Sequence, residues 1–378
     1  MSEQIPINPN VLKWARERSG FSLEEISKKY SKIDEWENEG SFPTYKQLEK
    51  LSNTYKCPIA VFFFPEPPKI EPIEKSFRTL PEQEFHKMPP KIRLLLRQAK
   101  AMQINLDELN EGTNPLKKQI INDLKFSVGT PVAQIAQEVR SYLNIPLKQQ
   151  SSWNDSDKAL ESWRTILTNH GIHIFKDAFK SEDFSGFCLY DKNFPVIYIN
   201  NSTSKTRQIF TMFHELGHLL FGTSGIDTDK DSYIRNLKND PKKIEIFCNK
   251  FSGAFLVPED DFKRSISGLN LNEDNITKLS KKYCVSREVI LRKLLDSDLI
   301  NQSYYNKKIK EWRGSKISKG KGGNYYYTQI SYLGDNYIQL ALSKYHRHQI
   351  NEEQVSGYLN IKPKNLAKFE GNFLGRGA

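Results

Sequence analysis

The stretch TMFHELGHLLFG, from Thr211 to Gly222, constrains the fold of this chain more than any other. Its apolar residues recur at helical spacing, which predicts a helix from about Thr206 to Phe221 with Gly222 as its stop. The apolar side of this helix consists of Ile209, Met212, Phe213, Leu216, Leu219 and Leu220.

Two histidines and a glutamate share this predicted helix. His214 and His218 are four positions apart and lie almost above one another, while Glu215 stands about 100° round from His214. Two imidazoles that can reach one cation, with a carboxylate beside them, form the layout of a zinc site with an adjacent general base. The alternative is two core histidines satisfied by hydrogen bonds.

A catalytic zinc needs a third protein ligand and a fourth position that is left for water. The stretch KIEIFCNKFSGAFLVPED offers Glu245, near the start of a second predicted helix and 27 residues beyond His218. Its apolar residues can face the core while Glu245 points back towards the metal; they are Phe247, Phe251, Ala254 and Phe255. Asn249 and Asp227 are candidates to accept a hydrogen bond from the outer nitrogens of the imidazoles.

The segments that precede this helix predict a small sheet. IHIFKD, FSGFCLYD and FPVIYIN are rich in β-branched and aromatic residues between turn formers, and they follow predicted helices at VAQIAQEVRSYL and KALESWRTILTNHG. The strand VIYIN can present an edge along which a substrate backbone lies as an added strand. Val196, Tyr198 and Asn200 are therefore candidate substrate-binding residues, unless this is an ordinary core strand.

The length of the chain, 378 residues, and its proline- and glycine-rich stretches indicate four parts. Residues 1–68 read as short helices, and residues 69–130 read as a linker that contains the amphipathic helix PKIRLLLRQAKAMQINLDELN. Residues 131–300 hold the candidate metal site, and residues 301–378 form a small basic extension. Together they predict an α+β protein: a helical first domain, a central domain of a small sheet and helices, and the extension.

Charge and cysteine content narrow the function classes. The net charge is +11, and residues 301–378 carry 13 Lys and Arg against 5 Asp and Glu. This surplus is either a solvated basic face or a contact for nucleic acid or an acidic partner. The four cysteines include no CxxC pair, so we expect reduced thiols in or near cores. No stretch has the length of a membrane span and the polar start is unlike a signal peptide, so we expect a cytoplasmic protein that does not enter membranes.

The stretch from Asn200 to Pro258 resembles the ImmA/IrrE family of zinc metallopeptidases, through FTMFHELGHLLFG and EIFCNKFSGAFLVP. In that family the third ligand is a helical Glu placed three residues before a small residue and four before an Asn, as Glu245 is before Cys248 and Asn249. Cys248 stands where alanine is usual. The resemblance implies a zincin-like domain with Zn²⁺ held by His214, His218 and Glu245. It also implies that Glu215 is the general base and that the substrate is a specific protein, typically a bound repressor.

The first region resembles the XRE type of helix-turn-helix in FSLEEISKKYSKIDEWENEGSFPTYKQLEKLSNTYKCP. The stretch between EEISKKY and IDEWE is about four residues shorter than the family pattern, which removes about one turn from the element that should enter the major groove. Residues 22–50 hold 7 acidic and 5 basic residues, whereas a DNA reader should be basic. DNA binding, protein docking and a purely structural role all stay open, and no DNA-binding residue is assigned.

The last region resembles the C-terminal extension of longer chains in the ImmA/IrrE family. We expect its stretch GGNYYYTQISYLG to form a tyrosine-rich strand that packs on the central domain. Asn351 with Gln354 predicts a helix start, and Pro363 suits a first helical position. Two short helices around NIKP can form a helix-turn-helix.

Two functions follow from these observations. The first is a cytoplasmic zinc-dependent endopeptidase that cleaves a specific partner, such as a repressor, a toxin or an antitoxin. The second is a transcriptional regulator or antitoxin that acts by binding DNA or protein without proteolysis. Neither the residue that stabilises the oxyanion nor the oligomeric state follows from the sequence.

Overall fold

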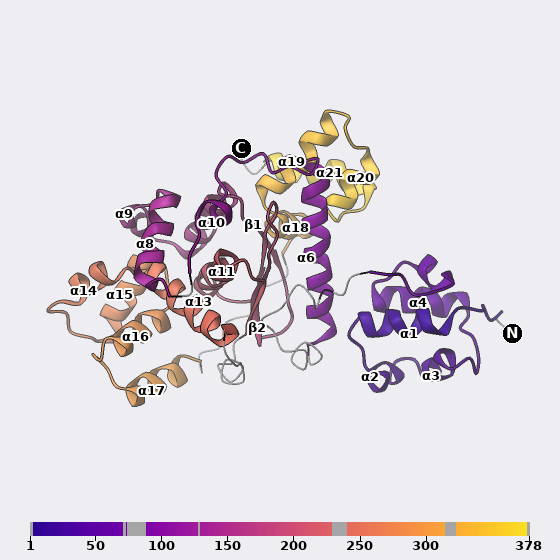
Figure 1. The fold of residues 1–378 in the computed structure, drawn as a ribbon, viewed down its shortest axis with the longest axis horizontal. Coiled ribbons are helices and arrows are strands. Elements are labelled where there is room, and N and C mark those ends of the chain that lie inside the picture. Colours follow the sequence, from indigo (N-terminus) through magenta and orange to yellow (C-terminus); the bar gives the residue numbers. More distant parts are fainter. Residues whose placement is uncertain are drawn as a thin grey trace. The chain divides into compact units, whose positions relative to one another are not determined.

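The computed structural model describes residues 3–70, 73, 88–127, 129–228, 240–313 and 323–375 (Figure 1). The chain divides into two compact units, Met1–Lys100 and Ala101–Ala378, which we describe separately. Most of the first part of the predicted linker, residues 71–72 and 74–87, lies outside the described residues.

The first unit consists of short helices. They are α1 Pro9–Arg18, α2 Leu23–Ser27, α3 Ile33–Glu37, α4 Tyr45–Tyr55 and the 3₁₀ helix η1 Ile59–Phe63, followed by α6 Pro90–Leu109, which crosses the boundary between the units. A capping box opens α2, because Ser22 accepts from the Glu25 backbone and Glu25 accepts from the Ser22 backbone. Helix α3 has only five residues.

A buried ion pair joins α1 to α3. Arg16 Nε lies 2.8 Å from Glu37 Oε1, and Arg16 Nη2 lies 2.9 Å from Glu37 Oε2. Both side chains are less than a tenth exposed, at 8% and 5%. The apolar core beneath them includes Trp36, Leu48 and Tyr55. This bidentate geometry and burial make the pair a stronger constraint than a surface salt bridge.

The second unit combines helices with one four-stranded sheet. Its first elements are α7 Ile120–Asp123, α8 Val132–Leu143, α9 Leu147–Ser152, α10 Ser156–Thr168, β1 His173–Asp177, β2 Phe184–Leu189, β3 Val196–Asn200, α11 Lys205–Leu220 and β4 Gly225–Thr228. They are followed by α13 Asp240–Leu256, α14 Glu259–Ile266, α15 Glu273–Tyr283, α16 Arg287–Asp296, α17 Gln302–Arg313, α18 Tyr325–Leu333, α19 Asp335–His346, α20 Glu352–Tyr358, η3 Pro363–Asn365 and α21 Leu366–Leu374.

The strands lie in the order β1-β3-β2-β4. Strand β3 pairs with β1 in parallel and with β2 in antiparallel fashion, and β2 also pairs with β4 in antiparallel fashion. Because β3 is hydrogen-bonded on both sides, it has no edge to offer to another strand. The prediction that a substrate backbone lies along β3 is therefore wrong.

The three residues proposed there have structural roles instead. Val196, Tyr198 and Asn200 are all buried. Tyr198 stacks on Phe187 with ring centroids 5.2 Å apart. Asn200 donates from its amide nitrogen to the carbonyl oxygens of Ser181 and Phe184, at 3.1 and 2.8 Å, so it holds the connection that leads into β2.

The sheet is covered on both faces, which explains why all of β3 is buried. One face packs in the main core against α10 and α11, and Figure 1 shows α11 running beside the sheet on that side. On the other face, Phe175 of β1 contacts Tyr337 of α19 edge-on at 5.3 Å. All four cysteines are free and buried, as predicted. Among the described helices, none pairs enough length with enough apolar sequence to cross a membrane.

The extension packs on the central domain, as predicted, but through a helix where a strand was expected. The tyrosine-rich stretch forms α18, whose N-cap Asn324 accepts from the Tyr326 backbone. Ile330 and Leu333, three residues apart on one helical face, are its buried residues, and α18 contacts β1. Burial at helical spacing thus overrides the β-propensity of the tyrosines. The predicted helix start is confirmed, because Asn351 and Gln354 form a capping box.

A single arginine of α10 fastens α18 to the sheet. The Arg164 guanidinium, 5% exposed, donates to the carbonyl oxygen of Ile174 in β1 at 2.7 and 2.9 Å. It also donates to the carbonyl oxygens of Ser331 and Tyr332, at 2.7 and 3.0 Å. One buried cation therefore satisfies carbonyl groups of both the sheet and the end of α18.

Replacing this arginine should loosen the extension. Arg164→Leu leaves one buried and two partly buried carbonyl oxygens without these donors, so we expect it to lower the free energy of unfolding by about 3 kcal/mol. Urea denaturation, followed with hydrogen exchange of α18, measures the effect. Lys158→Leu, at an exposed position of the same helix, is the matched control and should change stability by less than about 0.5 kcal/mol. Equal unfolding curves for the two variants would show that Arg164 does not anchor α18.

Candidate metal centre

Helix α11 brings His214, Glu215 and His218 into the interior of the second unit. The helix starts at Ser204, whose hydroxyl accepts from the Arg207 backbone, and its apolar side faces the main core. The three polar side chains are almost wholly buried, with exposed fractions of 1%, 0% and 0%. Burial of this kind requires partners, because an uncompensated polar or charged group in a core is costly.

The third residue comes from α13, which packs directly on α11. Glu245 is 3% exposed and faces both histidines. Its Oε2 lies 3.4 Å from His214 Nε2, its Oε1 lies 3.2 Å from His218 Nε2, and the two Nε2 atoms lie 3.3 Å apart. The structure therefore brings together the three residues that the sequence predicted as ligands, as one potential metal-binding group.

These separations suit a tetrahedral cation. With zinc-to-ligand distances of about 2.0 to 2.1 Å, neighbouring ligands of a tetrahedral site stand about 3.3 Å apart. The two nitrogen atoms and the nearest carboxylate oxygens lie at 3.2 to 3.4 Å from one another. Two imidazoles and a carboxylate are also a donor set that zinc uses in catalytic sites. The residues fit a zinc ion.

The charge around the histidines also favours a cation. Burial lowers the pKa of His214, but Asp227, Glu245 and Glu215 outweigh burial and raise that pKa to about 9. Burial likewise opposes ionisation of Glu245, yet His218 and His214 hold its pKa well below the usual range. Neither Glu215 nor Glu245 forms an ion pair with a Lys or Arg in the described part of the chain. The carboxylates around the imidazoles thus stabilise a positive charge at this position, whether it is a proton on His214 or a bound metal ion.

Glu215 differs from Glu245 in its environment. Burial raises the pKa of its carboxyl to about 7, against the lowering effect of His218 and His214. Neither carboxylate oxygen is engaged by a backbone donor among the described residues. A carboxyl group whose pKa lies near neutrality is suited to take up and release a proton.

Asn249 and Asp227 were predicted to accept a hydrogen bond from the outer nitrogens of the imidazoles, and the structure supports Asn249. Asn249 Oδ1 lies 3.2 Å from His214 Nδ1, where it can accept the ring proton and leave Nε2 facing the other ligands. The prediction that Asp227 accepts a hydrogen bond from an imidazole is wrong. Its carboxylate accepts instead from Thr211 Oγ1 at 2.9 Å and from Arg207 Nη2 at 3.1 Å, so it joins β4 to α11.

Two glycines complete the site and were not recognised from the sequence. A Cβ atom on Gly217 would lie 2.9 Å from Cys248 Sγ, so this glycine lets α11 and α13 approach closely. A Cβ atom on Gly225 would lie 2.3 Å from the His218 ring, so β4 can pass the imidazole only without a side chain there. The sequence signal was Gly217 inside the motif helix, where glycine is otherwise unfavourable.

Residues 167–295 match the family model of the IrrE N-terminal-like domain, Peptidase_M78. No curated protein matches the chain. The match spans β1 to β4, α11 and α13, and so contains the group of His214, His218 and Glu245. The matched family is zinc metallopeptidase-like, which agrees with the resemblance noted from the motifs. Residues 1–166 and 296–378 lie outside the match.

The ligand set predicts how metal content depends on three side chains. The purified chain should carry about one zinc ion, and His214→Ala, His218→Ala and Glu245→Ala should each lose most of it, because two remaining ligands hold a catalytic zinc poorly. Elemental analysis of the proteins after dialysis gives the ratio of metal to chain. Equal zinc content in all three variants and the wild type would contradict the site.

The close approach of β4 gives a subtler test. Gly225→Ala should reduce zinc occupancy while it preserves every ligand, because its methyl group displaces the His218 ring. Gly253→Ala on α13 is the control, since a Cβ atom there has nothing within 4 Å. We expect Gly253→Ala to keep its zinc. Similar zinc content in both alanine variants would show that Gly225 does not position His218.

Proposed function

We propose that this chain is a cytoplasmic zinc-dependent endopeptidase that cleaves a specific protein partner, such as a repressor, a toxin or an antitoxin. In this proposal His214, His218 and Glu245 hold the zinc and Glu215 is the general base. The main support for this proposal is the buried group of two imidazoles and a carboxylate, with Glu215 beside the histidines on α11. The match to the IrrE N-terminal-like domain supports the same chemistry.

The residues of the candidate metal centre have separate roles in the proposed hydrolysis. Zinc, when bound, acts as a Lewis acid that polarises the scissile carbonyl group and lowers the pKa of water. Glu215 takes the proton of the attacking water and delivers it to the leaving amine, which its raised pKa favours. Asn249 orients the His214 ring through Nδ1. Burial keeps bulk water away from these groups and strengthens the interactions among them.

The geometry of the sheet supports a path for the substrate. Strand β4 pairs with β2 on one side, and none of the described strands pairs with its other side. Gly225 brings the start of β4 against the His218 ring. A substrate segment that adds to this edge as an extended strand would therefore run beside the candidate metal ligands. This path takes the place of the one predicted along β3.

A conservative substitution separates catalysis from binding. Glu215→Gln keeps the size of the side chain and removes the base, so it should retain zinc and fold while cleavage falls by about a hundredfold or more. Comparison of new protein N-termini in cells that express the wild type or the variant identifies the substrate and measures the loss. Glu138→Gln, at an exposed position of α8, is the control and should cleave normally.

The alternative function, regulation by binding without proteolysis, predicts a different result for Glu215→Gln. If the chain is a regulator or antitoxin that acts by binding alone, Glu215→Gln will still control its locus fully in cells. Suppose that Glu215→Gln regulates fully and that cells with the wild type and cells with the variant contain the same protein N-termini. This result would rule out the peptidase and support a regulator that acts by binding alone.

A further inference from the structure

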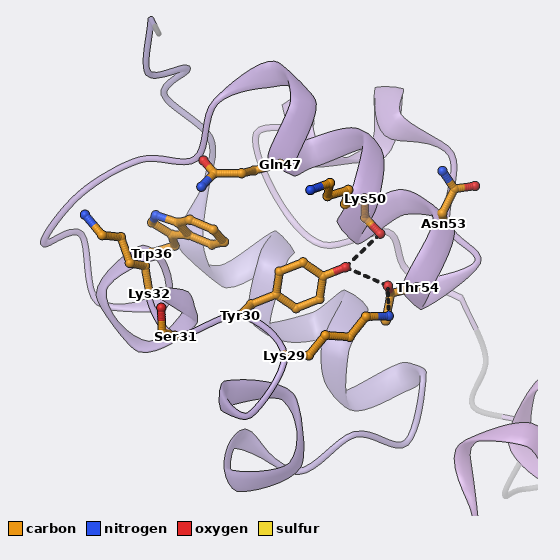
Figure 2. Close-up of a pocket in the computed structure, with 9 residues that line it drawn as sticks. All are labelled: Lys29, Tyr30, Ser31, Lys32, Trp36, Gln47, Lys50, Asn53 and Thr54. Carbon is orange, nitrogen blue, oxygen red and sulfur yellow. Dashed lines mark hydrogen bonds between the residues drawn. The ribbon is translucent and has the colours of Figure 1, made fainter. Parts of the chain in front are cut away.

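The first unit contains a surface groove of about 680 Å³ that is separate from the candidate metal centre. Figure 2 shows the groove between α4 and the connection from α2 to α3, with Tyr30 in its middle and lysine side chains around it. The residues that line it are Lys29, Tyr30, Ser31, Lys32, Trp36, Gln47, Lys50, Asn53 and Thr54.

Three lysines give the groove a positive charge. Lys29, Lys32 and Lys50 are exposed, and none of them forms an ion pair with a described carboxylate. Lys29 Nζ instead donates to Thr54 Oγ1 at 2.9 Å. The groove therefore presents cations whose charge the described part of the unit does not neutralise.

Five of the 7 acidic residues in 22–50 have partners outside the groove, and the other two, Glu39 and Glu49, do not line it. The five partners are Arg16 for Glu37, Lys28 for Glu24, the Ser22 backbone for Glu25, Ser41 for Glu35 and Asn38 for Asp34. The surplus of acidic residues counted over 22–50 thus does not describe the surface of the groove. In the folded unit, three lysines line the groove and no acidic residue does.

The shape and the aromatic rings disfavour nucleic acid as the ligand. A duplex is read by a protruding helix, whereas this surface is hollow and its neighbour α3 has only five residues. Single strands are bound by stacking bases on aromatic faces, but Trp36 and Tyr30 are only 2% and 9% exposed. The bases of a single strand would therefore find no exposed ring to stack on.

Amide groups in the groove suit a peptide backbone. Gln47 uses its Oε1 to accept from the Thr44 backbone at 2.7 Å, which leaves its Nε2 as a donor. Asn53 donates from its Nδ2 to the Glu49 carbonyl oxygen at 3.0 Å, which leaves its Oδ1 as an acceptor. Both side chains lie on the α4 wall of the groove, beside Lys50 (Figure 2).

We propose that this groove binds an acidic segment of a protein partner. Carboxylates of the segment pair with Lys32 and Lys50, while Gln47 and Asn53 bond to its backbone carbonyl and N–H groups. Charge complementarity of this kind selects the partner and speeds its association, and it weakens as salt rises. The inference does not depend on the chemistry of the metal centre.

Fluorescence anisotropy on the full chain at low salt tests this proposal. The probe is a labelled peptide of about a dozen residues in which Asp and Glu alternate with Gly and Ser, and its counterpart carries Asn and Gln instead. We expect the acidic peptide to bind at least about tenfold more tightly than the counterpart. The double variant Lys32→Glu/Lys50→Glu should weaken that binding about tenfold or more.

A matched double variant controls for net charge. Lys13→Glu/Lys69→Glu makes the same charge change at exposed positions of the unit that do not line the groove, and it should change the affinity less than about twofold. Equal effects of the two double variants, or no binding of the acidic peptide, would overturn the proposal. A labelled DNA duplex or single strand that binds more tightly than the peptide, and loses affinity in Lys32→Glu/Lys50→Glu, would reassign the groove to nucleic acid.

Discussion

The packing of α11 against α13 determines where the polar residues of the second unit meet. At Gly217 the two helices are so close that a Cβ atom would lie 2.9 Å from Cys248 Sγ and 3.2 Å from its Cα atom. The contact continues through Phe213 and Phe255, whose rings stack with centroids 4.3 Å apart. Only at such a distance can one side chain of α13 reach both histidines of α11. The His/His/Glu group is therefore a product of the apolar packing around it.

The sheet fixes α11 from its other side. Asp227 on β4 holds Thr211 and Arg207 of α11, and Gly225 lets the strand run against the His218 ring. Asp227 also adds to the negative charge that raises the pKa of His214. The same contacts thus position the edge strand, orient the helix and prepare the pocket for a cation. The shape of the cluster and its charge both favour the metal-dependent site that we propose.

Local patterns in the sequence predicted the elements better than their arrangement. The spacing of His214, Glu215 and His218 defines a helical face, and Glu245 follows from a second amphipathic helix, so the candidate site could be assembled before the fold was known. Strand order depends on pairings between distant segments, so the local pattern of VIYIN cannot show that this strand is interior. Tyr325 to Tyr327 have high β-propensity, yet burial of Ile330 and Leu333 makes the stretch helical. A count of charges over 22–50 likewise could not show which side chains face one groove.

X-ray absorption at the zinc edge reports the atoms around the metal in the intact chain, and so tests whether His214, His218 and Glu245 are the ligands. We expect a first shell of nitrogen and oxygen atoms at about 2.0 to 2.2 Å, with the multiple scattering of two imidazoles and with no sulfur. Cys188 and Cys248 are buried near these residues, so sulfur is the informative alternative. A sulfur shell at about 2.3 Å, or a spectrum without imidazole scattering, would contradict the assignment of His214, His218 and Glu245 as the ligands.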